Sequence, residues 1–230
     1  MKVLVIGDSR DAVEHIPLCL RLRWPSATMV FADTGAKGIE LVKAEPPDLV
    51  IADFSLPDMR CVDLVGNIRS FSDVPLTVLI GEGTEMDRAE VLETGADDYI
   101  RKPLSASDVL AKTNALLRRA RGDGFKPDQA SFVGGNLEIN FTNRRVIVSG
   151  NPVDLTQIEH NLLCQLVRNK GRVLTHQMLL EKVWGTEYIK DTSLVKDHMY
   201  RLRKKLQCGG INHQLIISQR GIGYKFIPPT

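Results

Sequence analysis

Hydrophobic positions in the first 120 residues form short continuous runs, separated by longer stretches in which apolar residues recur every three to four positions. A short continuous apolar run is typical of a strand buried on both faces, and the longer spacing is typical of a helix. Alternation of the two predicts a flavodoxin-like, five-stranded doubly wound parallel sheet with right-handed crossovers. We expect strands at Val3–Ile6, Thr28–Ala32, Leu49–Ala52, Leu76–Ile80 and Asp98–Arg101. We expect helices at Asp11–Leu22, Ala36–Ala44, Val62–Ser70, Met86–Glu93 and Ser107–Ala120. Pro17 should kink the first helix or end its first segment.

The second half follows a different order of elements. Two short strands, Leu137–Asn140 and Arg145–Val148, precede three predicted helices and a terminal hairpin. Thr156 and Glu159 have capping-box spacing, which indicates the start of the first of these helices. Three helices followed by a hairpin outline a winged helix-turn-helix domain. The helices are expected at 156–169, from Thr175 to Trp184-Gly185, and at about 192–207, and the hairpin strands at Leu215–Gln219 and Tyr224–Ile227.

Between the halves, residues 121–130 are rich in Gly, Pro and charge and have no periodicity. We therefore expect a domain at 1–120, a linker at 121–130 and a second domain at 131–230. Residues 1–120 carry 14 basic and 19 acidic side chains, whereas residues 121–230 carry 16 and 9. An acidic half joined to a basic half suggests different partners for each, with nucleic acid as the leading partner of the basic half.

The remaining composition excludes several classes of protein. No apolar stretch approaches the roughly 20 residues of a membrane span, and the first is too short for a signal sequence, so we expect a cytoplasmic protein. Cys19, Cys61, Cys164 and Cys208 form no C-x-x-C pair, which argues against a zinc or redox motif.

Three charged residues fall at the carboxyl ends of predicted strands, where ligands of open α/β sheets bind. Asp8 follows the first strand, Asp53 ends the third, and Lys102 follows the fifth. Two carboxylates and a lysine suit Mg²⁺ and phosphoryl transfer onto a carboxylate. The alternatives are helix caps for the two aspartates and a solvated surface position for the lysine.

These residues lie within motifs that resemble response regulators of the OmpR/PhoB type over essentially the whole chain. The resemblance implies a receiver domain in which Asp53 is the phosphoacceptor, Asp8 a metal ligand, Lys102 a phosphoryl contact and Tyr99 the aromatic switch. The motifs are Asp48–Asp53 with Leu56–Met59, then Gly95–Pro103, Gly171–Leu174, Val183–Gly185, Arg201–Leu206 and Arg220–Tyr224.

The chain departs from this family's pattern at the candidate site. Gly7 replaces the first of two acidic residues after the first strand, and Ile80 replaces the hydroxyl residue at the end of the fourth. Losing a carboxylate weakens Mg²⁺ binding, and Ile80 cannot donate a hydrogen bond to a phosphoryl group. Arg60 and Cys61 replace an acidic-Gly pair. Two hypotheses follow: Asp53 is phosphorylated inefficiently, or the receiver works as a phosphate-independent dimerisation domain, which we favour.

By the same resemblance, a homodimer is expected through the fourth helix, fifth strand and fifth helix of the receiver. Matching charges would pair across a two-fold axis, although plain surface charge is the alternative. The expected pairs are Arg88 with Asp108, Asp98 with Lys112, and Asp97 with Arg118 or Arg119.

The last predicted helix carries the strongest signal for DNA. Its apolar stripe is Val195, Met199, Leu202 and Leu206, and basic residues lie off that stripe, as in a helix that enters a major groove. A solvated basic helix is the alternative. By resemblance Arg201 is expected to contact bases, and Arg220 at the wing tip to enter the minor groove. The remaining DNA-binding candidates are Lys196, His198, Tyr200, Arg203 and Lys204. Tyr200 stands where many relatives have Arg, so we expect it to read a different base. The other four are expected to support the core or to contact phosphates.

The segment Trp184, Gly185 and Glu187 precedes this helix and, by resemblance, faces RNA polymerase; the alternative is that Trp184 is a core aromatic.

The sequence thus predicts a dimeric, sequence-specific transcription regulator that binds half-sites about 10–11 bp apart and is not an enzyme. Open alternatives are a conventional regulator phosphorylated on Asp53 by a histidine kinase, a Mg²⁺-dependent phosphotransferase or phosphatase with Asp53 as nucleophile, and an adaptor that does not bind DNA.

Overall fold

The computed structural model describes residues 1–81, 85–120, 131–189, 191–210 and 215–229, and the side chains of residues 85, 119, 120 and 187 are outside that description. Contacts divide the chain into two compact units, Met1–Arg121 and Gly122–Thr230. The expected linker, 121–130, lies outside the described residues. Within the described part, no helix is long and apolar enough to cross a membrane.

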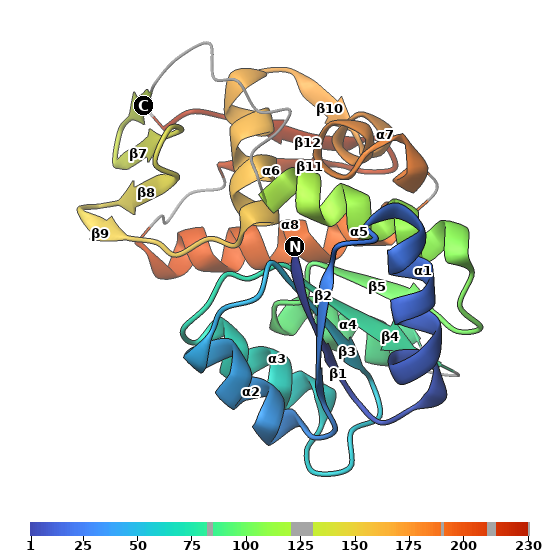
Figure 1. Ribbon diagram of the computed structural model, residues 1–230. Coiled ribbons are helices and arrows are strands. Elements are labelled where there is room, and N and C mark those ends of the chain that lie inside the picture. Colours follow the sequence, from blue (N-terminus) through green and yellow to red (C-terminus); the bar gives the residue numbers. More distant parts are fainter. Residues whose placement is uncertain (82–84, 121–130, 190, 211–214, 230) are drawn as a thin grey trace. The chain divides into compact units, whose positions relative to one another are not determined.

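The first unit is a parallel sheet with strand order β2-β1-β3-β4-β5, as the sequence predicts (Figure 1). Helix α1 packs against α5, and α3 packs against both α2 and α4, so helices cover both faces of the sheet. The strands are β1 (Lys2–Ile6), β2 (Thr28–Ala32), β3 (Leu49–Asp53), β4 (Leu76–Ile80) and β5 (Asp98–Arg101), and the helices are α1 (Ile16–Arg23), α2 (Gly35–Ala44), α3 (Cys61–Arg69), α4 (Glu85–Thr94) and α5 (Ala106–Ala120).

The central strands β3 and β4 are buried at every position, which explains their continuous apolar sequences. A strand covered by helices on both sides cannot alternate apolar with polar residues. Asp53 is the exception, since it is a carboxylate at the last position of β3 and only 2% exposed. Strand β3 therefore carries a charged group to the edge of the core.

The expected first helix is divided in the structure. A π-helical segment, η1 (Asp11–His15), precedes α1, and the backbone N–H of Ile16 donates to the carbonyl of Asp11. Pro17 lies in the first turn of α1, where its missing N–H costs little. The predicted interruption at Pro17 is thus confirmed, and π-helical segments are frequent at functional sites.

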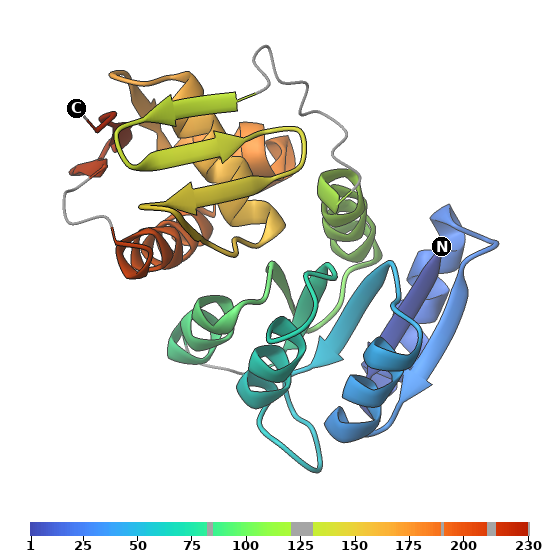
Figure 2. The same cartoon turned by 90° about the vertical axis from the view of Figure 1, so that its left-hand side faces the viewer.

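The second unit contains two antiparallel sheets and three principal helical segments. Figure 2 shows the strands of the first sheet, coloured yellow-green to yellow, in front of the helices. The sheets run β6-β7-β8-β9 and β10-β12-β11. Their strands are β6 (Ser131–Gly134), β7 (Leu137–Asn140), β8 (Arg145–Val148), β9 (Asn151–Pro152), β10 (Val173–Thr175), β11 (Ile216–Gln219) and β12 (Gly223–Phe226), and the helical segments are α6 (Gln157–Arg168), α7 (His176–Leu179), η2 (Leu180–Trp184), η3 (Thr186–Tyr188) and α8 (Thr192–Cys208).

The winged helix-turn-helix arrangement is confirmed by this element order. Thr156 and Glu159 form the predicted capping box at the start of α6. The predicted apolar stripe of α8 is buried, with no member more than 2% exposed. A Cβ on Gly223 would lie 1.9 Å from the carbonyl oxygen of Leu174, so glycine is what lets β12 pair closely with β10.

Strands β6, β9 and β10 were not predicted, because each has only two to four residues and no clear apolar run.

Candidate phosphoacceptor site and nucleic-acid interface

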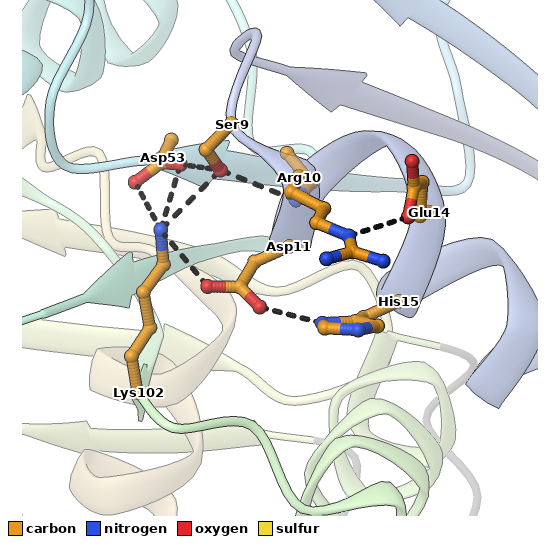
Figure 3. A network of polar contacts seen from close by, with 8 residues as sticks. Ser9, Arg10, Asp11, Glu14, His15, Asp53 and Lys102 are labelled. Atoms are coloured by element: carbon orange, nitrogen blue, oxygen red, sulfur yellow. Dashed lines mark hydrogen bonds and ion pairs between the residues drawn. The ribbon is translucent and has the colours of Figure 1, made fainter.

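Asp53 and Lys102 meet at the carboxyl edge of the parallel sheet, as their strand-end positions predict. Asp53 ends β3, and the backbone N–H of Lys102 extends the β4–β5 pairing by donating to the carbonyl of Ile80. The Nζ atom of Lys102 lies 2.9 Å from Oδ2 and 3.1 Å from Oδ1 of Asp53. Figure 3 shows the lysine pointing at this carboxylate. The ammonium group therefore neutralises a carboxylate that is almost fully buried.

Ser9 is a third member of this site. Its hydroxyl group donates a short hydrogen bond to Oδ2 of Asp53, and its Oγ atom lies 3.3 Å from Nζ of Lys102 (Figure 3). The same oxygen accepts from the backbone N–H of Ala12, which fixes Ser9 to the start of η1. The sequence analysis missed Ser9, although its position directly after Asp8 was an available signal.

Two further side chains extend the network outward along η1. Oδ2 of Asp11 lies 3.5 Å from Nζ of Lys102, and Oδ1 lies 2.6 Å from Nδ1 of His15 (Figure 3). The hydrogen bond to His15, together with the charge of Lys102, lowers the pKa of the Asp11 carboxyl. Asp11 and His15 were also missed, because their proximity to Asp53 depends on the helical path of residues 11–15.

Gly7 has a backbone conformation that an acidic residue rarely adopts. Its φ is +134°, and a Cβ at this position would lie 2.7 Å from Cβ of Asp53. Asp8, the expected metal ligand, is exposed. Among the described residues, no group of three His, Cys, Asp or Glu side chains has an arrangement that could hold a metal ion. In this conformation Lys102 binds both oxygens of Asp53, and Ser9 binds one of them.

The expected switch residues are both buried. Ile80 is 3% exposed at the end of β4, and Tyr99 is 5% exposed on β5. Three cations surround the Tyr99 ring: Nζ of Lys112 lies 4.6 Å from its centroid, and the guanidinium carbons of Arg88 and Arg101 lie 5.4 Å and 5.9 Å away. Cation–π contacts of this kind hold the ring in one position.

Cys61, which stands where the family usually has glycine, is 2% exposed in the first turn of α3. Burial, with a smaller contribution from the charge of Asp53, raises the pKa of its thiol to about 12. Cys61 is therefore an uncharged apolar neighbour of the site rather than a reactive thiolate.

Two of the expected intersubunit ion pairs use carboxylates that are bound within the chain. Asp97 is 4% exposed and lies 2.9 Å from the guanidinium of Arg69, and it also accepts from the backbone N–H of Leu76. Asp98 is fully buried and lies 3.0 Å from Nζ of Lys112 in the same chain. In this conformation both aspartates are engaged within the chain, and their contact with a second subunit stays a prediction.

The other expected dimer residues are distributed differently. Asp108 is exposed and Arg88 is half-buried beside Tyr99, where its guanidinium lies 3.4 Å from the phenol oxygen. The side chain of Arg119 lies outside the described residues, while Arg118 is partly exposed. The pairing of Arg88 with Asp108 stays a prediction.

Arg201, the residue of α8 that was expected to contact bases, lies in the core. Arg201 is 5% exposed, its Nε atom lies 3.2 Å from Oε1 of Glu159, and its guanidinium makes a short hydrogen bond with Nδ1 of His198. His198 is fully buried. Both side chains are engaged in the core in this conformation, so base contact by Arg201 would require it to leave Glu159 and stays a prediction. Arg201 is held there by the fully buried Glu159 carboxylate, which needs a cation beside it.

Arg203 is also held within the domain. Its guanidinium donates to the carbonyl of Ile216 at 2.6 Å and to Oγ of Ser218 at 2.9 Å, and it lies over the ring of Tyr224. This residue ties α8 to the wing, consistent with the alternative that it supports the core. The remaining candidates are exposed: Lys196, Tyr200 and Lys204 on α8, and Arg220 beside Gly221, whose φ is +74°, at the wing tip.

Trp184 is fully buried at the end of η2, with its ring centroid 5.3 Å from that of His198. This supports the interpretation of Trp184 as a core aromatic. Gly185 is buried as well and has a φ of +117°. The side chain of Glu187 lies outside the described residues, so a polymerase-facing role for this loop stays a prediction.

Comparisons with known proteins agree with this architecture. Residues 3–114 match the family described as response regulator receiver domain, and residues 150–226 match transcriptional regulatory protein, C terminal. The chain is 34% identical over 224 residues to the sensory transduction protein RegX3 of Mycolicibacterium smegmatis, covering 97% of both chains. It is 35% identical over 228 residues to the DNA-binding response regulator MtrA of the same organism, covering 99% of this chain and 97% of that one.

Among solved structures, a RitR mutant matches with a TM-score of 0.72 and 25% identity, covering 99% of each chain. A receiver followed by a winged helix defines a DNA-binding response regulator, which is a transcription factor and not an enzyme. This chain belongs to the OmpR/PhoB family of response regulators. Receiver domains usually bind Mg²⁺ and imply a histidine kinase as partner.

Proposed function

We propose that this protein is a sequence-specific transcription regulator whose dimerisation and DNA binding do not depend on phosphorylation of Asp53. One observation carries the proposal: Ser9 and Lys102 bind the oxygens of Asp53, while Gly7 occupies the place of an acidic metal ligand. A phosphoryl donor must displace Ser9 from the carboxylate before Asp53 can attack. Of these residues, Gly7 departs from the family's pattern, whereas Lys102 lies in a motif shared with the family.

Weak binding of Mg²⁺ follows from the same geometry. Affinity for a hard cation rises with the number of charged oxygen ligands. With Gly7 in place of an acidic residue, the carboxylates expected from the family's metal site are reduced to Asp8 and Asp53, and the Lys102 ammonium already lies 2.9 Å from Asp53. A divalent cation would have to compete with that ammonium group for the same oxygens. Without an efficiently bound cation, the charge that develops during phosphoryl transfer is poorly neutralised.

The readout of phosphate is also weakened. A phosphoryl group shifts a conformational equilibrium only if it binds one state more tightly than the other. Ile80 offers no hydroxyl for such a contact, and Tyr99 is already held by three cations from α4, β5 and α5. Phosphorylation of Asp53 would therefore change the conformation of the α4–β5–α5 face only slightly.

The DNA-binding surface that we propose consists of the exposed basic residues of the second unit. Lys196 and Lys204 lie on α8 and Arg220 on the wing, where they would neutralise phosphates or enter a minor groove. For the dimer, the α4–β5–α5 face remains our candidate, with Arg88 and Asp108 as the pair still to be tested. A two-fold dimer would place two α8 helices on successive major grooves.

The test compares the untreated protein with Asp53→Asn. We expect both to elute as dimers and to bind the same selected DNA with affinities within about twofold of each other. Acetyl phosphate with Mg²⁺ should change neither property in the wild-type protein. A conventional, kinase-driven regulator gives the opposite result: acetyl phosphate converts a monomer to a dimer and raises DNA affinity, and Asp53→Asn removes the response. If the protein instead hydrolysed a phosphate ester, that result would support the alternative function as a phosphatase.

A further inference from the structure

The burial of Arg201 and His198 leaves α8 with few side chains that can read a base. Arg203 is bound to the carbonyl of Ile216, and Lys205 lies 2.8 Å from the buried Glu159 carboxylate. These four residues stabilise the domain instead of facing outward. The helix must therefore recognise DNA with a different set of side chains from the basic cluster that its sequence suggests.

Three of the exposed residues of α8 form one row along the helix. Lys196, Tyr200 and Lys204 are spaced by four residues, which places them on one face of the helix, and all three are exposed. Within the described part of the chain, no hydrogen bond or ion pair engages any of them. Tyr200 is 54% exposed, which is unusual for a large aromatic side chain in water. Tyr200 thus has one lysine a helical turn before it and another a turn after it. Such a surface suits DNA, because DNA has negative phosphates and apolar groups on its base edges.

The chemistry of the three side chains differs. Lysine ammonium groups are point charges that bind phosphates without a directional preference. Tyr200 has an apolar ring and a hydroxyl that donates a hydrogen bond. In the major groove, the C5-methyl of thymine is the apolar group on a base edge, and purine N7 atoms are acceptors.

We propose that Tyr200 is the specificity-determining residue of α8 and reads a thymine through its methyl group, with the hydroxyl donating to an adjacent purine N7. This inference rests on the proposed DNA-binding function of α8 and specifies its substrate: a half-site with a thymine–purine step under the helix. An arginine at this position would favour guanine, so the two side chains select different sequences.

The test begins with selection of duplexes from a random pool by the purified full-length protein. Each thymine of the selected site is then replaced by deoxyuridine, which removes only the methyl group, and affinity is measured by fluorescence anisotropy. We expect one thymine in each half-site whose replacement weakens wild-type binding about fourfold. Tyr200→Phe should keep this sensitivity because it keeps the ring, and Tyr200→Ala should lose it.

Lys204→Ala is the matched control from the same row. It should weaken selected and random DNA alike and lower the slope of log affinity against log salt by about one, while deoxyuridine sensitivity stays. Tyr200→Ala should leave the salt slope unchanged. The inference is overturned if wild type is insensitive to every deoxyuridine, or if Tyr200→Ala selects the same sequence as wild type. Failure to select any sequence would overturn the proposed function itself, and the inference with it.

Discussion

The guanidinium of Arg201 lies 3.2 Å from the carboxylate of Glu159, and both side chains are buried between α6 and α8. Burial alone would raise the pKa of Glu159, but the nearby charges of Arg201 and Lys205 lower it below the usual value. This ion pair fixes α8 to α6. It also removes from the DNA surface an arginine that the sequence marks as a base contact.

Glu159→Gln should destabilise the winged-helix domain by about 3 kcal/mol, because the Arg201 charge would stay buried without its partner. Urea unfolding followed by tryptophan fluorescence measures this change, since Trp184 is fully buried in the same domain. The double variant Glu159→Gln, Arg201→Met should lose less than the sum of the two single variants. Additive losses would contradict a direct pair.

Gly7→Asp should fail to create a strong magnesium site. The substitution adds a carboxylate, but a non-glycine residue at a φ of +134° costs about 1–3 kcal/mol and its Cβ would crowd Asp53. Gly7→Ala is the matched control, because it has the same backbone strain without the charge. We expect equal loss of stability in both variants and little gain in Mg²⁺ affinity by calorimetry. A large gain for Gly7→Asp alone would mean that the loop adapts readily.

Ser9→Ala should increase the reactivity of Asp53 towards acetyl phosphate and Mg²⁺. Removing the hydroxyl frees one carboxylate oxygen, and a hydrogen bond to a charged group is worth about 1.5–3 kcal/mol, so a gain of about tenfold in initial rate is expected. Intact-protein mass measures the modification, with Asp53→Asn as the blank. Ser55→Ala is the control, since Ser55 is exposed in the same loop region. An unchanged rate would show that Ser9 does not restrain the site.

The winged-helix domain should lose stability between about pH 6.5 and pH 4. Burial, with a smaller effect of Arg144, lowers the pKa of His160 to about 4, whereas the unfolded chain takes up a proton near 6.5. In that interval the unfolded state binds more protons, so stability falls as the pH falls, by about 3 kcal/mol in total. Unfolding of wild type and His160→Gln at several pH values measures this. The variant should have a visibly smaller dependence.

Much of the fold was predictable because its signals are local. Strands β2, β4 and β5 have the bounds that the sequence predicts, and the Thr156 capping box marks the start of α6. The short strands β9 and β10 were not predictable, since two or three residues carry no periodicity. Asp53 and Lys102 were placed together correctly because the carboxyl ends of parallel strands converge.

The sequence by itself determined the architecture of the two domains, the pairing of the Asp53 carboxylate with Lys102, and the absence of a hydroxyl at Ile80. Only the tertiary structure decided which charges face inward. Arg201, Asp97 and Asp98 read as surface residues along the chain, yet each is paired in the core. The physical reason is that burying a charge depends on a partner brought from a distant segment, as Glu159 is brought to Arg201, and no periodic pattern records that partner.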